Sequence, residues 1–133
     1  MLRFLAYIPL LLVFTLGCGE ASGSRRAVQG SVKLRGVPLD NGTITFFKSK
    51  QQAGGALIKD GAYSLPAPQG LDPGKYLVRI NSMEPVAFTP EDYAAGKTPP
   101  EAKDRIPPAF NTESKQEVEV KETGVNQFDF AVE

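Results

Sequence analysis

The sequence contains no histidine. Histidine is the commonest general base near neutral pH and a frequent ligand of metal ions, so its absence removes both functions at once. No Ser–His or Cys–His pair can be built to activate a nucleophile. The composition therefore predicts that the protein is not an enzyme and that it has no metal site and no cofactor.

The sequence also lacks an excess of charge of either sign, and it lacks a second cysteine with which a disulfide could form. The chain has 15 basic and 15 acidic residues, which gives a net charge of zero, and like charges form no block along it. A nucleic-acid partner is therefore not expected. The chain has one cysteine, Cys18, so an intramolecular disulfide is excluded.

The sequence has no apolar run long enough for a membrane-spanning helix. Residues 4–16 are almost entirely apolar, but a helix of this length reaches only about 20 Å, short of the ~30 Å hydrocarbon core. A basic start, a short apolar run and small residues after it are typical of a secretory signal peptide. We therefore expect a signal peptide over residues 1–17.

The junction after this run, Thr15-Leu16-Gly17-Cys18-Gly19, resembles the lipobox of bacterial lipoproteins, although a lipobox usually has Leu where this chain has Thr15. The resemblance implies cleavage between Gly17 and Cys18 and a diacylglyceryl group on the Cys18 sulfur. It also implies a lipoprotein of the cell envelope that is anchored to the membrane at Cys18 and faces the periplasm or the cell exterior. The alternative is an ordinary secreted protein in which Cys18 is incidental.

Residues 18–26 are mostly small or polar and predict a flexible, lipidated tether. One acyl chain binds a membrane reversibly, whereas two or three bind firmly, because each buried methylene contributes about 0.8 kcal/mol. Arg25 and Arg26 end the tether. Contact with anionic headgroups and a solvated position are the two alternatives for these arginines.

From residue 27 onward the chain repeats one pattern, a turn followed by a short alternating strand. Asp72-Pro73-Gly74 is a typical turn sequence, and apolar and polar residues alternate after it. This pattern predicts an all-β domain over residues 27–133, a seven-stranded antiparallel β-sandwich. The polar, Gly-rich residues 49–55 are expected to form a loop. The expected strands are residues 28–34, 43–48, 56–59, 62–65, 75–80, 117–121 and 127–132.

The alternation also predicts which side chains form the core. Ile44 and Phe46 share one face of their strand, so Phe47 is expected on the other face, against a second packed surface or in solvent. Tyr63 and Tyr76 are in register with core positions, so they are expected to pack inside the domain rather than line a ligand surface.

Residues 83–113 show no hydrophobic period and contain six of the 11 prolines. They predict one long Pro-rich loop. Within it, Thr89 followed by Pro90 favours the start of one short helical turn, with Thr89 as the N-cap. Long loops without regular structure in compact domains are often functional.

Seven motifs follow one another along residues 27–133. They are Val28-x-Gly30-x-Val32, Gly36-x-Pro38-Leu39, Gly42-x-Ile44-x-Phe46, Asp60-Gly61-x-Tyr63, Pro73-Gly74-Lys75-Tyr76-x-Val78-x-Ile80, Ile106-Pro107-Pro108-x-Phe110-Asn111-Thr112-x-Ser114 and Gly124-x-Asn126-x-Phe128-Asp129-Phe130. The order and spacing of the first five resemble the carboxypeptidase regulatory-like domain, and the last two resemble small lipoproteins of the planctomycete type, so the resemblance covers nearly the whole mature chain. It implies a transthyretin-like (prealbumin-like) β-sandwich. That fold includes hydroxyisourate hydrolases, which rely on histidines that this chain lacks.

Two functions are consistent with these observations. The first is a cell-envelope lipoprotein carrying a non-catalytic binding or interaction module, with loop 83–111 as its surface and an envelope protein or polysaccharide as its partner. Phe88, Tyr93 and Phe110 are the candidate binding residues, provided that they form one exposed patch. The alternative is a purely structural envelope lipoprotein with no small-molecule ligand, in which the rings are buried and the loop plugs the sandwich.

Overall fold

The computed structural model of the protein describes residues 24–133. The signal peptide predicted over residues 1–17, the cleavage site between Gly17 and Cys18, and Cys18 itself lie outside these residues. Residues 24–133 form nine strands, one α-helix and two 3-10 helices. In chain order they are β1 (Val28–Leu34), β2 (Val37–Pro38), β3 (Asn41–Lys48), β4 (Gln51–Lys59), β5 (Ala62–Leu65), η1 (Ala67–Gln69), β6 (Gly74–Asn81), α1 (Pro90–Ala94), η2 (Pro108–Phe110), β7 (Gln116–Val120), β8 (Asn126–Gln127) and β9 (Phe130–Val132).

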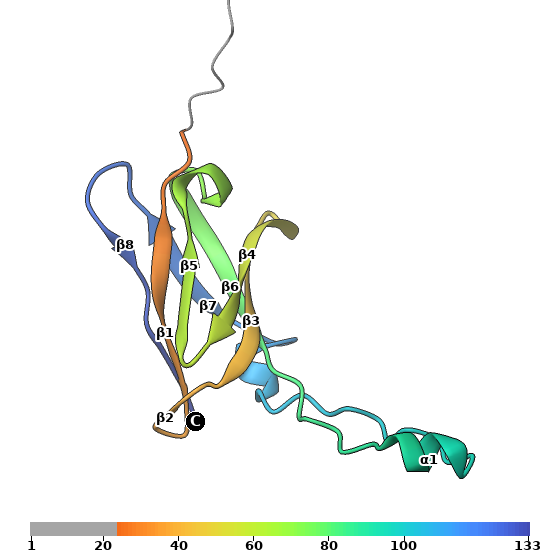
Figure 1. Ribbon diagram of the computed structural model, residues 1–133. Helices are drawn as coiled ribbons and strands as arrows, with labels where there is room; N and C mark the ends of the chain where they lie inside the picture. The colour runs from red at the N-terminus through yellow and green to blue at the C-terminus, as the bar shows by residue number, and fades with distance from the viewer. Residues whose placement is uncertain (1–23) are drawn as a thin grey trace, which may run out of the picture.

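The strands form one sheet that curls into a half-barrel (Figure 1). The strand order is β2-β1-β5-β4-β3-β6-β7, and β8 and β9 both pair with β1. Neighbours along the main path are antiparallel, whereas β8 and β9 run parallel to β1. The predicted all-β fold is confirmed, and the predicted antiparallel pairing holds except for β8 and β9, which run parallel to β1.

The predicted number of seven strands is wrong, because residues 24–133 form nine. The two-residue strand β2 lies between the expected strands 28–34 and 43–48 and pairs with the end of β1. The last expected strand is divided into β8 and β9 because Asp129 interrupts the ladder. Its carboxylate accepts hydrogen bonds from the backbone N and the Oγ of Ser31, at 2.8 and 2.9 Å. A side chain therefore replaces a backbone partner at this point.

The loop predicted over residues 49–55 is also wrong. Strand β4 begins at Gln51 and pairs with β3 along nearly its whole length. The turn consists of Ser49 and Lys50, whose φ angles are both positive, 50° and 66°. Two residues with positive φ suit the right-handed twist of a tight hairpin. Cross-strand pairing therefore overrides the low strand propensity of the glycines in β4.

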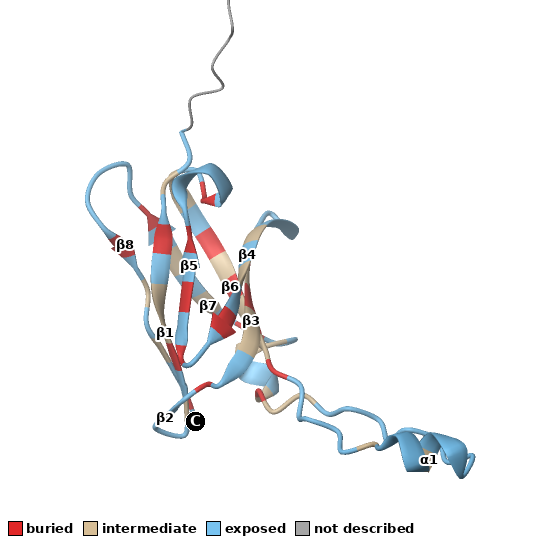
Figure 2. Cartoon of the chain, viewed as in Figure 1, coloured by how far each residue is buried: buried red, intermediate tan, exposed pale blue. Residues whose placement is uncertain are grey.

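The core lines the inner face of the half-barrel. The faces predicted for Ile44 and Phe46 on β3, Tyr63 on β5 and Tyr76 on β6 are confirmed, since each is at most 3% exposed. Figure 2 shows that buried positions are concentrated on the strands, while the segment carrying α1 is almost entirely exposed. The buried apolar residues are Val28, Val32, Leu39, Ile44, Phe46, Ile58, Tyr63, Leu65, Leu71, Tyr76, Val78, Ile80, Ile106, Val120 and Val132.

The hydroxyl groups of both core tyrosines donate hydrogen bonds to backbone carbonyls. The Tyr63 hydroxyl donates to the carbonyl O of Phe128 at 2.6 Å, and the Tyr76 hydroxyl donates to that of Asp72 at 2.7 Å. Burial raises the pKa of Tyr63, and the charge of Asp129 raises it further. Gly30 is required beside this contact, because a Cβ there would lie 1.8 Å from the carbonyl O of Phe128. The glycine of the Val28-x-Gly30-x-Val32 motif therefore makes room for the chain between β8 and β9.

The first described residues belong to the fold. Arg26, which we expected at the end of the tether, pairs with Leu71 through two backbone hydrogen bonds of 2.7 and 3.0 Å. Its Nε also donates to the carbonyl O of Glu122 at 2.8 Å. Arg26 is therefore held against the end of the sheet rather than solvated.

Candidate functional site

The long Pro-rich segment contains a projecting arm, which we define as residues 83–103. It leaves the end of β6 and returns before η2, and Figure 1 shows it extending away from the sheet with α1 at its tip. Its base is closed by a β-bridge between Met83 and Asp104 and by a 2.8 Å hydrogen bond from the N of Glu84 to the carbonyl O of Lys103. All arm residues are exposed except Phe88 and Asp92, which are half-buried.

The tip of the arm is a capped helical turn. The backbone N of Asp92 donates to the Oγ1 of Thr89 at 3.2 Å, and the backbone N of Thr89 donates to the Asp92 carboxylate at 3.0 Å. This is a capping box, so the predicted N-cap at Thr89 with Pro90 inside the helix is confirmed. Lys97 Nζ lies 2.6 Å from the same carboxylate. This hydrogen bond, and then those from Thr89, lower the pKa of Asp92.

The three predicted binding residues do not form one patch. Phe88 and Tyr93 contact each other on the arm, edge to face, with ring centroids 4.5 Å apart. Tyr93 is 66% exposed. Phe110 belongs instead to η2, where its half-buried ring packs against the core. The structure therefore divides the predicted loop 83–111 between an exposed arm and a segment packed on the sheet.

The packed segment begins at Ile106, which is 4% exposed and part of the core. It includes Phe110 and continues to Ser114, whose buried Oγ donates a hydrogen bond to the carbonyl O of Val78. The hydrogen bond to Val78 holds the chain against β6 before it enters the edge strand β7. The segment thus covers part of the sheet, as the plug interpretation expected, while the arm does not.

A polar cluster at the base of the arm was not recognised in the sequence. The Asp104 carboxylate accepts four hydrogen bonds, from the backbone N of Ser82 at 3.0 Å and of Ile106 at 2.9 Å, and from the side-chain amides of Asn81 at 2.9 Å and Asn111 at 2.8 Å. Burial disfavours its charged form, but these hydrogen bonds outweigh burial, so the pKa of Asp104 is lowered. The only sequence signal was an acidic residue in a long loop, and this signal is not specific.

Arg105 extends the same cluster to β3. Its Nη2 donates to the Oγ of Ser82 at 2.7 Å and lies 2.6 Å from the carboxylate of Asp40. The hydrogen bond from Arg105 lowers the pKa of Asp40. Ser82 is 1% exposed, and its Oγ in turn donates a hydrogen bond to the carbonyl O of Asn41 at 2.6 Å. The base of the arm is therefore fixed to the ends of two neighbouring strands, β3 and β6.

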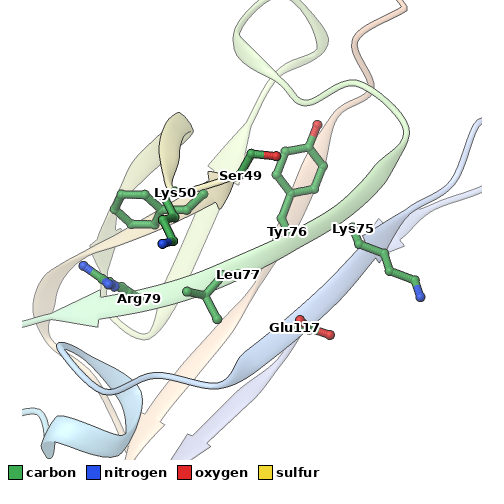
Figure 3. Close-up of a pocket in the computed structure, with 8 residues that line it drawn as sticks. Ser49, Lys50, Lys75, Tyr76, Leu77, Arg79 and Glu117 are labelled. Atoms are coloured by element: carbon green, nitrogen blue, oxygen red, sulfur yellow. The ribbon is translucent and has the colours of Figure 1, made fainter.

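A second feature is a hollow of about 450 Å³ on the outer face of the sheet (Figure 3). Phe47 lies there, on the face opposite Phe46, and the Arg79 guanidinium carbon is 4.9 Å from its ring centroid. Arg79 Nε is buried and has no hydrogen-bond partner among the described residues. Lys50, Lys75 and Glu117 also line the hollow, so three basic groups face one acidic group.

No group of three or more His, Cys, Asp or Glu side chains within residues 24–133 is placed to hold a metal ion. No helix in the same part of the chain is long and apolar enough to cross a membrane. The chain matches no protein-family model and no curated protein.

Proposed function

We propose that the protein is a cell-envelope lipoprotein, anchored through a lipid on Cys18, that carries a non-catalytic interaction module. Its binding element is the arm, and its partner is an envelope protein or polysaccharide. The observation that carries this proposal is that the arm extends from the sheet with an ordered tip that contributes nothing to the core. Exposed loops held by a rigid scaffold are the usual place for binding residues.

The arm is suited to binding because it is already ordered, so it has little conformational entropy left to lose when a partner binds. The capping box fixes the turn around Thr89, and the prolines of the arm restrict its backbone. The edge-to-face contact holds Phe88 against Tyr93. A surface that is ordered before binding loses less conformational entropy when its partner arrives. Exposed tyrosine is a frequent anchor in interfaces because it combines apolar area with a polar hydroxyl.

We also propose that the half-barrel corresponds to the two layers of a transthyretin-like sandwich, the fold implied by the carboxypeptidase regulatory-like motifs. Strands β4 and β5 are joined by a single residue pair, Lys59 with Ala62. A junction this narrow lets the sheet bend sharply. The bend separates β2-β1-β5 from β4-β3-β6-β7, which supports the two-layer interpretation.

The alternative function, a structural envelope lipoprotein without a small-molecule ligand, has one observation in its favour. Ile106, Phe110 and Ser114 pack on the sheet, so part of the long segment serves the fold. The two functions differ in what they require of the arm tip, which must contact a partner only in the first. A measurement of the molecules that contact Tyr93 in the envelope therefore distinguishes the two functions.

A photo-crosslinking amino acid at Tyr93 should form discrete adducts in intact cells. Leu57 on β4 is the matched control, since it is 72% exposed against 66% for Tyr93 but lies on the sheet. We expect adducts from position 93 and none from position 57, detected as mass-shifted bands and identified by mass spectrometry. The absence of adducts from both positions would support the structural function. Equal adducts from both would move the binding surface onto the sheet.

Processing at the amino terminus gives an independent prediction. Mass spectrometry of the native protein should show that residues 1–17 are removed and that Cys18 carries the lipid. The Cys18→Ser variant should remain uncleaved by the lipoprotein peptidase, because that enzyme requires the lipid-modified cysteine. A free thiol at the mature amino terminus, or cleavage at another position, would contradict the anchor.

A further inference from the structure

Four segments meet at one end of the sheet, which we call the entry end. They are residues 24–28 leading into β1, residues 66–75 around η1 and the start of β6, residues 48–51 around the β3–β4 turn, and residues 119–122 at the end of β7 (Figure 1). Hydrogen bonds join the first two of these segments: Ser24 Oγ donates to the carboxylate of Asp72, and Arg25 Nη1 donates to the carbonyl O of Pro68 at 3.3 Å. The arm leaves from the opposite end of the sheet (Figure 1).

The entry end is basic in a chain whose net charge is zero. Its three acidic residues are Asp72, Glu119 and Glu122, against six basic residues, which leaves a net charge of +3. The ion pairs of Lys97 with Asp92 and of Arg105 with Asp40 lie on the arm and at its base. Five of the basic residues have exposed side chains and carry the inference: Arg25, Lys48, Lys50, Lys75 and Lys121.

The lysines come from separate stretches of the sequence but lie at this one end of the sheet, because β3 pairs with β6 and β6 with β7. Lys48 Nζ lies 5.6 Å from the ring centroid of Tyr76 and 3.2 Å from where a Cβ on Gly74 would be. Lys50 and Lys75 line the same hollow (Figure 3). Lys50, whose φ is positive, lies in the tight β3–β4 turn, and the pairing of Phe47 with Leu77 brings this turn beside the start of β6. Folding thus gathers cations from the turn and from β6 on one surface.

The arm has the opposite charge. It contains four acidic residues, Glu84, Glu91, Asp92 and Glu101, and two basic ones, Lys97 and Lys103, a net charge of −2. The domain therefore has a basic end where the described chain begins and an acidic projection at the other end. An anionic surface would attract the first and repel the second.

We propose that the entry end binds the anionic headgroups of the membrane that holds the lipid, so that the arm points away from the bilayer. This inference rests on the proposed anchor at Cys18. Ser24 follows Cys18 by six residues, which span at most about 21 Å. The entry end therefore stays close to the headgroups whatever path the tether takes. Each lysine or arginine near an anionic surface strengthens binding by about fivefold.

The test uses the mature protein, lipidated at Cys18, reconstituted in vesicles of phosphatidylcholine, with or without about one third phosphatidylglycerol. Lysines are acetylated briefly with a water-soluble reagent, and the rate at each lysine is read by mass spectrometry. On the anionic vesicles Lys48, Lys50, Lys75 and Lys121 should react several-fold more slowly than on neutral ones. Lys97 and Lys103 on the arm are internal controls and should react equally on both. Salt at about 1 M, where the Debye length is about 3 Å, should remove the protection.

Vesicle flotation in the same samples separates the two proposals. Protein that does not float with either vesicle contradicts the anchor. Protein that floats but shows equal acetylation of Lys50 and Lys75 on both vesicles contradicts the basic membrane contact alone. The double variant Lys50→Glu/Lys75→Glu should float yet lose the protection at Lys48 and Lys121. Lys97→Glu/Lys103→Glu, which makes the same charge change on the arm, should keep it.

Discussion

Replacing Phe46 by alanine should lower the free energy of unfolding by about 3–5 kcal/mol, whereas the same change at Phe47 should cost about 1 kcal/mol or less. Phe46 is fully buried and packs near Tyr63, with ring centroids 6.2 Å apart. Its removal leaves a cavity in addition to the lost transfer energy. Phe47, on the outer face, loses mainly its contact with Arg79.

The adjacent phenylalanines are matched controls for each other, because the side chain removed and the strand are the same. Urea unfolding of a soluble form that begins at Ser24 measures both losses, with an unchanged m-value as the sign of an intact two-state transition. Val78→Ala should resemble Phe46→Ala in direction, since Val78 is also fully buried. Equal losses at positions 46 and 47 would show that both faces of β3 are packed.

The Asp104→Ala variant should lose about 2–4 kcal/mol, because four donors lose a charged acceptor and two of them are backbone groups. In a domain of this size the melting temperature should fall by about 10 °C. Amide hydrogen exchange in the arm should also rise, since its base would no longer be fixed. Asp92→Ala is the matched control: its carboxylate is also hydrogen-bonded and has a lowered pKa, but it lies at the tip and should leave the melting temperature nearly unchanged.

The free energy of unfolding should depend on pH through the ionisation of Asp104. The pKa of Asp104 is lowered from 3.8 in the folded protein, so its carboxylate contributes full stability above the unfolded-state value. That contribution is lost as the pH falls through the folded-state pKa. The stability difference between the wild type and Asp104→Ala should therefore shrink in acid, as measured by melting curves across that range. A difference that stays constant down to the lowest pH would contradict the role of the charged carboxylate.

Features that depend on near neighbours could be predicted from the sequence. The inner face of β6 follows from alternation, and the N-cap at Thr89 follows from the next residue, Pro90, and from Asp92 three positions on. Both depend on backbone geometry that is local and has few alternatives. The loop predicted at residues 49–55 failed for the opposite reason, because those residues become a strand only by pairing with β3.

The candidate site was predictable only in outline. The absence of a period identified the long segment, but it could not divide that segment into an exposed arm and a packed stretch. That division depends on Asp104 meeting Ser82 and Asn111, and on Ile106 entering a core made by distant strands. The separation of Phe110 from Phe88 and Tyr93 follows from the same contacts.

The sequence by itself determined that the chain is β-rich, which faces of most strands are apolar, where several turns lie, and that the net charge is zero. The tertiary structure decided how those balanced charges are separated in space, with basic residues at one end of the sheet and acidic residues on the arm. Lys48, Lys50, Lys75 and Lys121 come together because β3 pairs with β6, and β6 with β7. A basic end opposite an acidic arm is thus a consequence of strand order, because the surface potential depends on distances in space and not along the chain.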